Sequence, residues 1–176
     1  MKHGRMRLIS AIGAIALCAG GSLPPAYAGP AELALLTSYI GEWKGSSVLE
    51  GGKKPEPFKC RLTIDKGNQT KINYAGRCTL VSMNLSVSGT IAYDDPSQTY
   101  QAIMGSNAGF TGVAIGKQQG DKIVFDLEEK QEDKAGNYVR IGARITLVAQ
   151  TSITVDYEVE FNNSGNVLTA NVPFTK

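Results

Sequence analysis

Few residues in this chain of 176 could carry chemistry. It contains one histidine, His3, and three cysteines, Cys18, Cys60 and Cys78. Histidine is the commonest acid–base group at neutral pH, the usual partner of a Ser or Cys nucleophile and the commonest zinc ligand. The sequence offers no nucleophile–base pair, no phosphate-binding glycine loop and no spacing typical of metal ligands. We therefore expect no catalytic residues, no metal, no cofactor and no enzymatic activity.

Carboxylates are the remaining candidates for chemistry, and they fall into two groups. The first is an acidic cluster interleaved with lysines: Asp126, Glu128, Glu129, Glu132 and Asp133. Its spacing fits no known calcium loop, so a solvated strand end is the favoured interpretation. The second group, Asp156, Glu158 and Glu160, alternates with apolar residues, which indicates the wet face of a strand rather than an acid–base pair.

Residues 1–28 have the three parts of a secretory signal. A basic start precedes an apolar run, and the segment ends in Ala26-Tyr27-Ala28, the small-x-small pattern that signal peptidases cleave after. We expect Sec-type export, cleavage after Ala28 and a periplasmic or secreted protein. His3 and Cys18 would leave with the signal. The remaining residues, 29–176, suit one domain.

Removal of the signal also changes the charge. The whole chain has 18 Lys and Arg against 16 Asp and Glu, and residues 1–28 hold three of these basic residues and no acidic one. The net charge of residues 29–176 is therefore near −1. Without a cluster of Lys and Arg, nucleic acid is not an expected partner.

Cys60 and Cys78 are predicted to form a disulfide. Both lie on the apolar register of their strands, and these strands flank the turn Asp65-Lys66-Gly67-Asn68. A hairpin at that turn places the two cysteines roughly opposite each other. Exported proteins with two cysteines usually pair them.

The pattern of apolar residues predicts a short helix followed by strands only. After Pro30, Leu33, Leu36 and Ile40 share one helical face and Gly41 ends the helix. Beyond Gly41 the period is two, and turn signals at short intervals separate nine or ten strands. We predict an all-β fold, an antiparallel up-and-down barrel with a β-sandwich as the alternative. The low aromatic content and short loops do not favour a membrane-spanning barrel.

The motif Gly41-Glu42-Trp43-Lys44-Gly45 after a short helix resembles the lipocalin-like (calycin) superfamily. The resemblance implies that the Trp43 indole closes one end of the barrel as a structural plug. In this superfamily an Arg from a late strand often covers the indole, which implies that role for Arg140 or Arg144. A cation over an indole contributes about 1 kcal/mol at an exposed site.

The extended Gly-x-Trp-x-Gly motif, with residues 89–94 and Tyr100, is similar to ten-stranded barrels of the nitrobindin and fatty-acid-binding type. Uncharacterised exported barrels belong to this group. Nitrobindin-like proteins hold haem through a histidine, which residues 29–176 lack. The resemblance therefore implies the fold without the haem.

Five aromatic residues on inward registers are candidates for lining a ligand cavity: Tyr74, Tyr93, Phe110, Phe125 and Tyr157. These rings could equally well fill the barrel. Small residues on the same registers, such as Gly89 and Gly116, favour a cavity, because a ten-stranded barrel is wider than side chains readily fill. An interior volume above about 300 Å³ would favour a ligand carrier.

Three functions are compatible with these features. The first is an exported, non-enzymatic barrel that binds a small hydrophobic or amphipathic ligand in its interior. The second is a protease inhibitor that acts on a protein partner through the N-terminal segment 29–40, as small lipocalin-like inhibitors do. The third is a structural envelope protein with a filled barrel.

Overall fold

The computed structural model describes residues 29–81, 83–132, 136–148 and 150–176. The expected signal segment, 1–28, lies outside them. The described residues form one helix and ten strands: α1 (Pro30–Ser38), β1 (Gly41–Leu49), β2 (Glu56–Lys66), β3 (Lys71–Thr79), β4 (Asn84–Asp94), β5 (Thr99–Ser106), β6 (Thr111–Gln119), β7 (Lys122–Glu132), β8 (Tyr138–Val148), β9 (Ser152–Phe161) and β10 (Asn166–Thr175).

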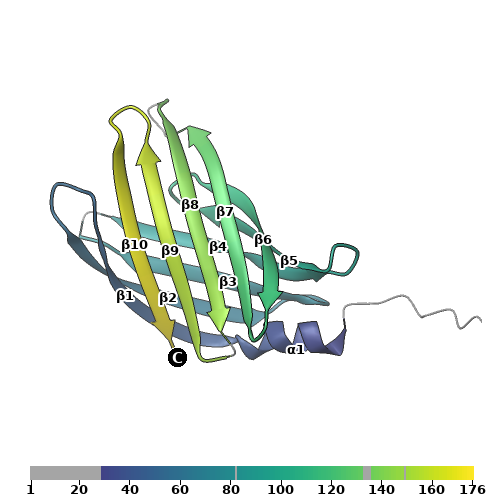
Figure 1. Ribbon diagram of the computed structural model, residues 1–176. Helices are drawn as coiled ribbons and strands as arrows, with labels where there is room; N and C mark the ends of the chain where they lie inside the picture. Colours follow the sequence, from purple (N-terminus) through teal and green to yellow (C-terminus); the bar gives the residue numbers. More distant parts are fainter. Residues whose placement is uncertain (1–28, 82, 133–135, 149) are drawn as a thin grey trace, which may run out of the picture.

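The ten strands form a closed antiparallel barrel. Each strand pairs with the next one in the sequence, and β10 pairs with β1 to close the ring (Figure 1). The predicted barrel is therefore confirmed, and the sandwich alternative is wrong. Closure removes the two strand edges that an open sheet of this width would expose.

Helix α1 packs against the barrel near the beginning of β1 (Figure 1). Pro30 begins the helix, where its missing N–H costs nothing. Of the predicted set, Leu36 is fully buried and Ile40 packs against the core, whereas Leu33 does not belong to the core. Tyr39, which follows the helix, is also fully buried. Gly41 has a φ of 140°, which favours glycine at the step from helix to strand. Among the described residues no helix is long and apolar enough to cross a membrane.

The alternation of apolar and polar residues decides which side chains face the interior. In β7, Ile123, Phe125 and Leu127 are buried and the residues on either side of Leu127 are exposed.

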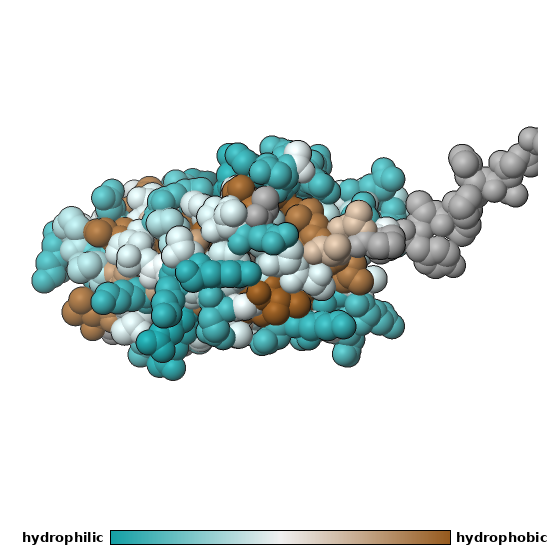
Figure 2. Space-filling model, turned by 90° about the horizontal axis from the view of Figure 1, so that it is seen from below, coloured by the Kyte–Doolittle hydropathy of each residue, from teal (hydrophilic) through white to brown (hydrophobic). Residues whose placement is uncertain are grey.

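The odd-numbered strands end at one end of the barrel, here called the open end, and α1 lies at the other, the closed end. On the side where α1 lies, hydrophilic and hydrophobic residues are intermixed (Figure 2).

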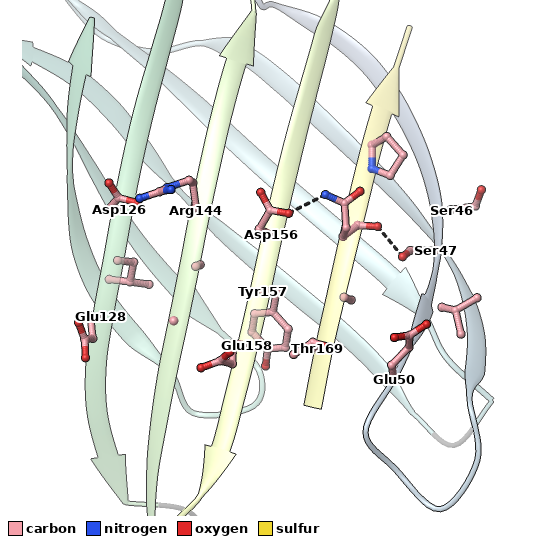
Figure 3. A pocket seen from close by; sticks show the side chains of 17 residues that line it. Ser46, Ser47, Glu50, Asp126, Glu128, Arg144, Asp156, Tyr157, Glu158 and Thr169 are labelled. Atoms are coloured by element: carbon pink, nitrogen blue, oxygen red, sulfur yellow. Dashed lines mark hydrogen bonds and ion pairs between the residues drawn. The ribbon is translucent and has the colours of Figure 1, made fainter. Parts of the chain in front are cut away.

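The contact between β1 and β10, here called the seam, is the weakest of the ten pairings. The two strands pair at Lys44–Thr175 and Gly45–Phe174, and again at the isolated bridge Glu50–Thr169. Between these points, residues 46–49 and 170–173 make no ladder pairs with each other, although they pair with β2 and β9. Pro173 lies in this interval and has no N–H to donate. Instead, the Ser47 hydroxyl donates a hydrogen bond to the Asn171 carbonyl (Figure 3).

The predicted disulfide is present. Cys60 on β2 and Cys78 on β3 are directly opposed in the ladder, with their Cα atoms 4.0 Å apart, and their sulfur atoms are bonded. Cys60 is buried against the barrel interior. The bond ties together two neighbouring strands of the wall.

Candidate functional site

The interior of the barrel contains a cavity of about 400 Å³. All ten strands contribute to its wall, and most of the lining side chains are aliphatic or aromatic. Small-molecule sites typically occupy about 300–1,000 Å³ and combine an apolar wall with a few polar groups. The cavity has the volume and the wall of such a site, and it exceeds the volume above which the sequence analysis favours a ligand carrier.

Four of the five aromatic residues proposed as ligand-lining border this cavity: Tyr74, Phe110, Phe125 and Tyr157. The fifth, Tyr93, is not part of its wall. Its ring packs edge-on against Tyr100, with ring centres 5.0 Å apart. Tyr93 is the penultimate residue of β4, which ends at the closed end. Burial, together with the charges of Glu32 on α1 and Asp95, raises the pKa of Tyr93.

The glycines on inward registers make room for these rings. A Cβ at Gly89 would lie 2.6 Å from the Tyr74 hydroxyl and 1.9 Å from the carbonyl oxygen of Ile103. A Cβ at Gly116 would lie 2.4 Å from the Phe125 ring. The absence of side chains at these two glycines therefore leaves room for the rings of Tyr74 and Phe125, both of which border the cavity.

Two tyrosine hydroxyls supply polar atoms within the apolar wall. The Tyr74 hydroxyl donates a hydrogen bond of 3.2 Å to the carbonyl of Ile103. The Tyr157 hydroxyl makes no hydrogen bond with any residue that the structure describes. Burial raises the pKa of each of these tyrosines to about 12, so both are neutral at physiological pH. They can donate or accept a hydrogen bond but cannot act as bases.

Glu129 and Gln131 add polar groups toward the open end of the cavity, and the sequence analysis did not assign either of them to the interior. They continue the inward register of Ile123, Phe125 and Leu127 on β7, and both are half-buried. The signal was present as strict alternation along β7. It was obscured because Glu129 lies within a run of charged residues that was interpreted as a solvated strand end.

Trp43 closes the other end of the barrel. It is fully buried, and its indole N–H donates a hydrogen bond of 2.9 Å to the carbonyl of Tyr39, the residue that follows α1. The cation over its ring is Lys176, whose Nζ lies 4.9 Å from the ring centre. Helix, indole and lysine together form the closed end.

Arg140 and Arg144 do not cover the indole, so that expectation is wrong. Both alternate with buried residues of β8 and therefore face outward. Arg140 donates to Glu160 and Glu158 at 2.8 Å, and the hydrogen bond to Glu160 raises its pKa. Arg144 donates to Asp126 at 2.6 Å. Their carboxylate partners on β7 and β9 hold these arginines on the outer surface.

A second depression, an open groove of about 1110 Å³, crosses the outer face of β7 to β10 and reaches the seam (Figure 3). Five of its six charged side chains, all but that of Glu50, have a hydrogen-bond or ion-pair partner among the described residues. Asp126 accepts from Arg144, and Asp156 accepts from Asn171 at 2.6 Å. In the described part of the chain, no group of three or more His, Cys, Asp or Glu could hold a metal ion. The internal cavity is therefore the stronger candidate site.

Comparisons with known proteins identify the fold only. No protein-family model matches the chain, and no curated protein matches it in sequence. Among solved structures, Rv2717c from M. tuberculosis is similar with a TM-score of 0.61 and 13% identity, covering 84% of this chain and 98% of that one. The S-type phycobiliprotein lyase CPES from Guillardia theta has a TM-score of 0.52 and 10% identity, covering 80% and 89%. These neighbours fit a lipocalin-like fold.

Proposed function

We propose that this protein is an exported, non-enzymatic member of the lipocalin-like superfamily that binds a small hydrophobic or amphipathic ligand inside its barrel. The observation that carries the proposal is the cavity of about 400 Å³ with its largely apolar wall. Burial of an apolar ligand there would remove hydrophobic surface from water on both partners. The similarity to a phycobiliprotein lyase is compatible with a ligand-binding barrel.

Two features support the remaining parts of this proposal. The Cys60–Cys78 bond is typical of proteins that fold in an oxidising compartment, as a periplasmic or secreted protein does. The polar groups of the cavity wall do not form a nucleophile–base pair, which supports a binding role rather than a catalytic one.

The two alternative functions receive less support. An inhibitor that acts through residues 29–40 needs a segment free to enter a protease, but Leu36 and Tyr39 are fully buried against the barrel. A purely structural barrel would be filled, whereas this one encloses a cavity.

The test is a titration with a neutral apolar dye, N-phenyl-1-naphthylamine, whose fluorescence rises in an apolar environment. Ala143→Phe would fill the cavity, because Ala143 lines it and lies opposite Tyr157 in the ladder. We expect wild type to bind the dye and this variant to bind it about tenfold more weakly or worse. Thr146→Phe, at an outward position of the same strand, is the matched control and should bind as wild type does. Native mass spectrometry of the purified protein would identify a co-purified ligand. Failure of wild type to bind the dye would contradict the proposal.

A further inference from the structure

Glu129 is a carboxylate on the inner wall of an otherwise largely apolar cavity. It belongs to the inward register of β7, lies opposite Ile141 in the ladder and borders the cavity near its open end. Glu129 is half-buried, whereas the side chain of its neighbour Glu128 is 77% exposed on the outer face. Two consecutive glutamates of one strand thus face opposite sides of the barrel wall.

Glu129 has no partner among the residues that the structure describes. The neighbouring polar side chains of the open end form hydrogen bonds with backbone groups and not with Glu129. Gln131 donates to the carbonyl of Thr111, and the Ser106 hydroxyl accepts from the N–H of Ala108. Glu129 makes no hydrogen bond or ion pair within the described ranges. The carboxylate is therefore available to bind a cationic group that enters the cavity, through a charge-assisted hydrogen bond.

Gly112 on β6 provides the space that Glu129 occupies. A Cβ at position 112 would lie 2.9 Å from the Leu127 Cδ1, 3.3 Å from the Glu129 Cγ and 3.4 Å from the Glu129 Oε1. The absence of a side chain at Gly112 therefore leaves room for both Leu127 and the Glu129 carboxylate. Position 112 and position 129 work together in placing this charge.

Two cations, Arg61 and Arg77, also border the cavity. They lie directly opposite each other on β2 and β3, at outward positions of the alternation, and both are exposed. In the ring of strands, β2 lies on the far side of the barrel from β7. Because water solvates the guanidinium groups of exposed arginines, a bound anion would add little to them. The half-buried Glu129 carboxylate has less contact with water.

From this arrangement we infer that the ligand is a cationic amphiphile, an apolar body that carries a protonated amine, and that Glu129 binds the ammonium group at the open end of the cavity. The inference rests on the proposed function and specifies the ligand class for the same cavity. The apolar body would lie between Tyr157 and Phe125, deeper in the barrel. A charge-assisted N–H···O bond to a carboxylate is stronger than a neutral one, which gives the amine its advantage over other head groups.

The experiment compares three ligands with the same alkyl chain: dodecylamine, dodecan-1-ol and dodecanoic acid. Each displaces N-phenyl-1-naphthylamine from wild type, Glu129→Gln and the control Glu128→Gln at neutral pH. In wild type we expect the amine to bind about tenfold more tightly than the alcohol, and the acid more weakly than the alcohol. Glu129→Gln should reduce the affinity for the amine to that for the alcohol and leave the alcohol unchanged. Glu128→Gln should behave as wild type does.

The outcomes separate the two proposals. If the dye and the alcohol bind but the amine has no advantage, or if Glu129→Gln changes nothing, the inference is wrong while the proposed function stands. Tighter binding of the acid would assign the head group to Arg61 and Arg77 and would also overturn the inference. If neither the dye nor any alkyl ligand binds, the proposed function itself fails. The order of affinities in wild type decides the matter even if Glu129→Gln does not fold.

Discussion

Lys176 covers the indole of Trp43, with its Nζ 4.9 Å from the ring centre, while the same ammonium group donates a hydrogen bond to the carbonyl of Ser38 at the end of α1. The Lys176 side chain thus contacts both the Trp43 ring and the end of helix α1. The closed end therefore depends on contacts between the two ends of the folded domain.

The first prediction concerns this plug. Trp43→Ala should lower the free energy of unfolding by about 3–5 kcal/mol, because it removes a large aromatic side chain from the core. Lys176→Ala should lower it by only about 0.5–1 kcal/mol, the value of an exposed cation–π contact. Trp43 is the single tryptophan of the chain, so its fluorescence reports on this site alone. Lys44→Ala, at an exposed position of β1, is the control. An indole that iodide quenches freely would contradict the assignment.

The second prediction concerns the disulfide. Replacing Cys60 and Cys78 together by Ala should lower the free energy of unfolding by about 3 kcal/mol, because the bond limits the entropy of the unfolded chain over a separation of 18 residues. Urea unfolding of oxidised wild type, reduced wild type and the double variant measures this effect. The reduced wild type and the double variant should agree closely. Free thiols in the exported, unreduced protein would count against the bond.

The third prediction concerns two glycines on neighbouring strands. Gly89→Ala should destabilise the protein by about 1–3 kcal/mol or more, because its Cβ would collide with the Ile103 carbonyl and the Tyr74 hydroxyl. Gly105→Ala is the matched control on β5, since no atom lies within 4 Å of the added Cβ. It should be neutral or slightly stabilising. Thermal unfolding of both variants decides the comparison, and equal losses would show that crowding at Gly89 is not the cause.

The fourth prediction concerns alkaline pH. Burial raises the pKa of Tyr74 and of Tyr157 from 10.0 to about 12, so the folded state holds these protons more tightly than the unfolded state does. Below pH 10 both states keep these protons, and the stability has its full value. As the pH rises from 10 to about 12, the unfolded state loses the protons while the folded state keeps them. The free energy of unfolding therefore falls by about 2–3 kcal/mol for each ring. An ultraviolet titration of the phenolates should show a late phase that Tyr157→Phe reduces by one residue. A late phase of unchanged size would refute the assignment of Tyr157.

The barrel and its disulfide could be predicted from the sequence because both follow from local patterns. Alternation with a period of two decides which side chains face inward, and the hairpin between β2 and β3 brings Cys60 opposite Cys78. The hairpin is centred on Gln69, so Asp65 and Lys66, expected in the turn, belong to β2 instead. The ends of the barrel could not be predicted in this way. Alternation does not say how far along the axis an inward residue lies, so Tyr93 was grouped with the cavity although it lies near the closed end.

Two further residues show where the sequence reasoning failed. The resemblance to lipocalin-like proteins, which often carry an arginine in a late strand, predicts Arg140 over the indole, although the alternation in β8 already places this residue outside. Glu129 was overlooked because its acidic neighbours suggested a solvated cluster. In both cases the register of the strand was a better guide than the resemblance or the local composition.

The incomplete pairing of the seam has a consequence for how the barrel forms and opens. Its hydrogen bond from Ser47 to Asn171 joins residues 124 positions apart in the sequence, whereas the other strand pairs join neighbours along the chain. The entropy of closing so long a loop must be overcome before the seam contributes any contact. We expect the seam to form last during folding and to open first in the native state. Amide hydrogen exchange should then be fastest, among the strands, at those N–H groups of residues 46–49 and 170–173 that face the gap.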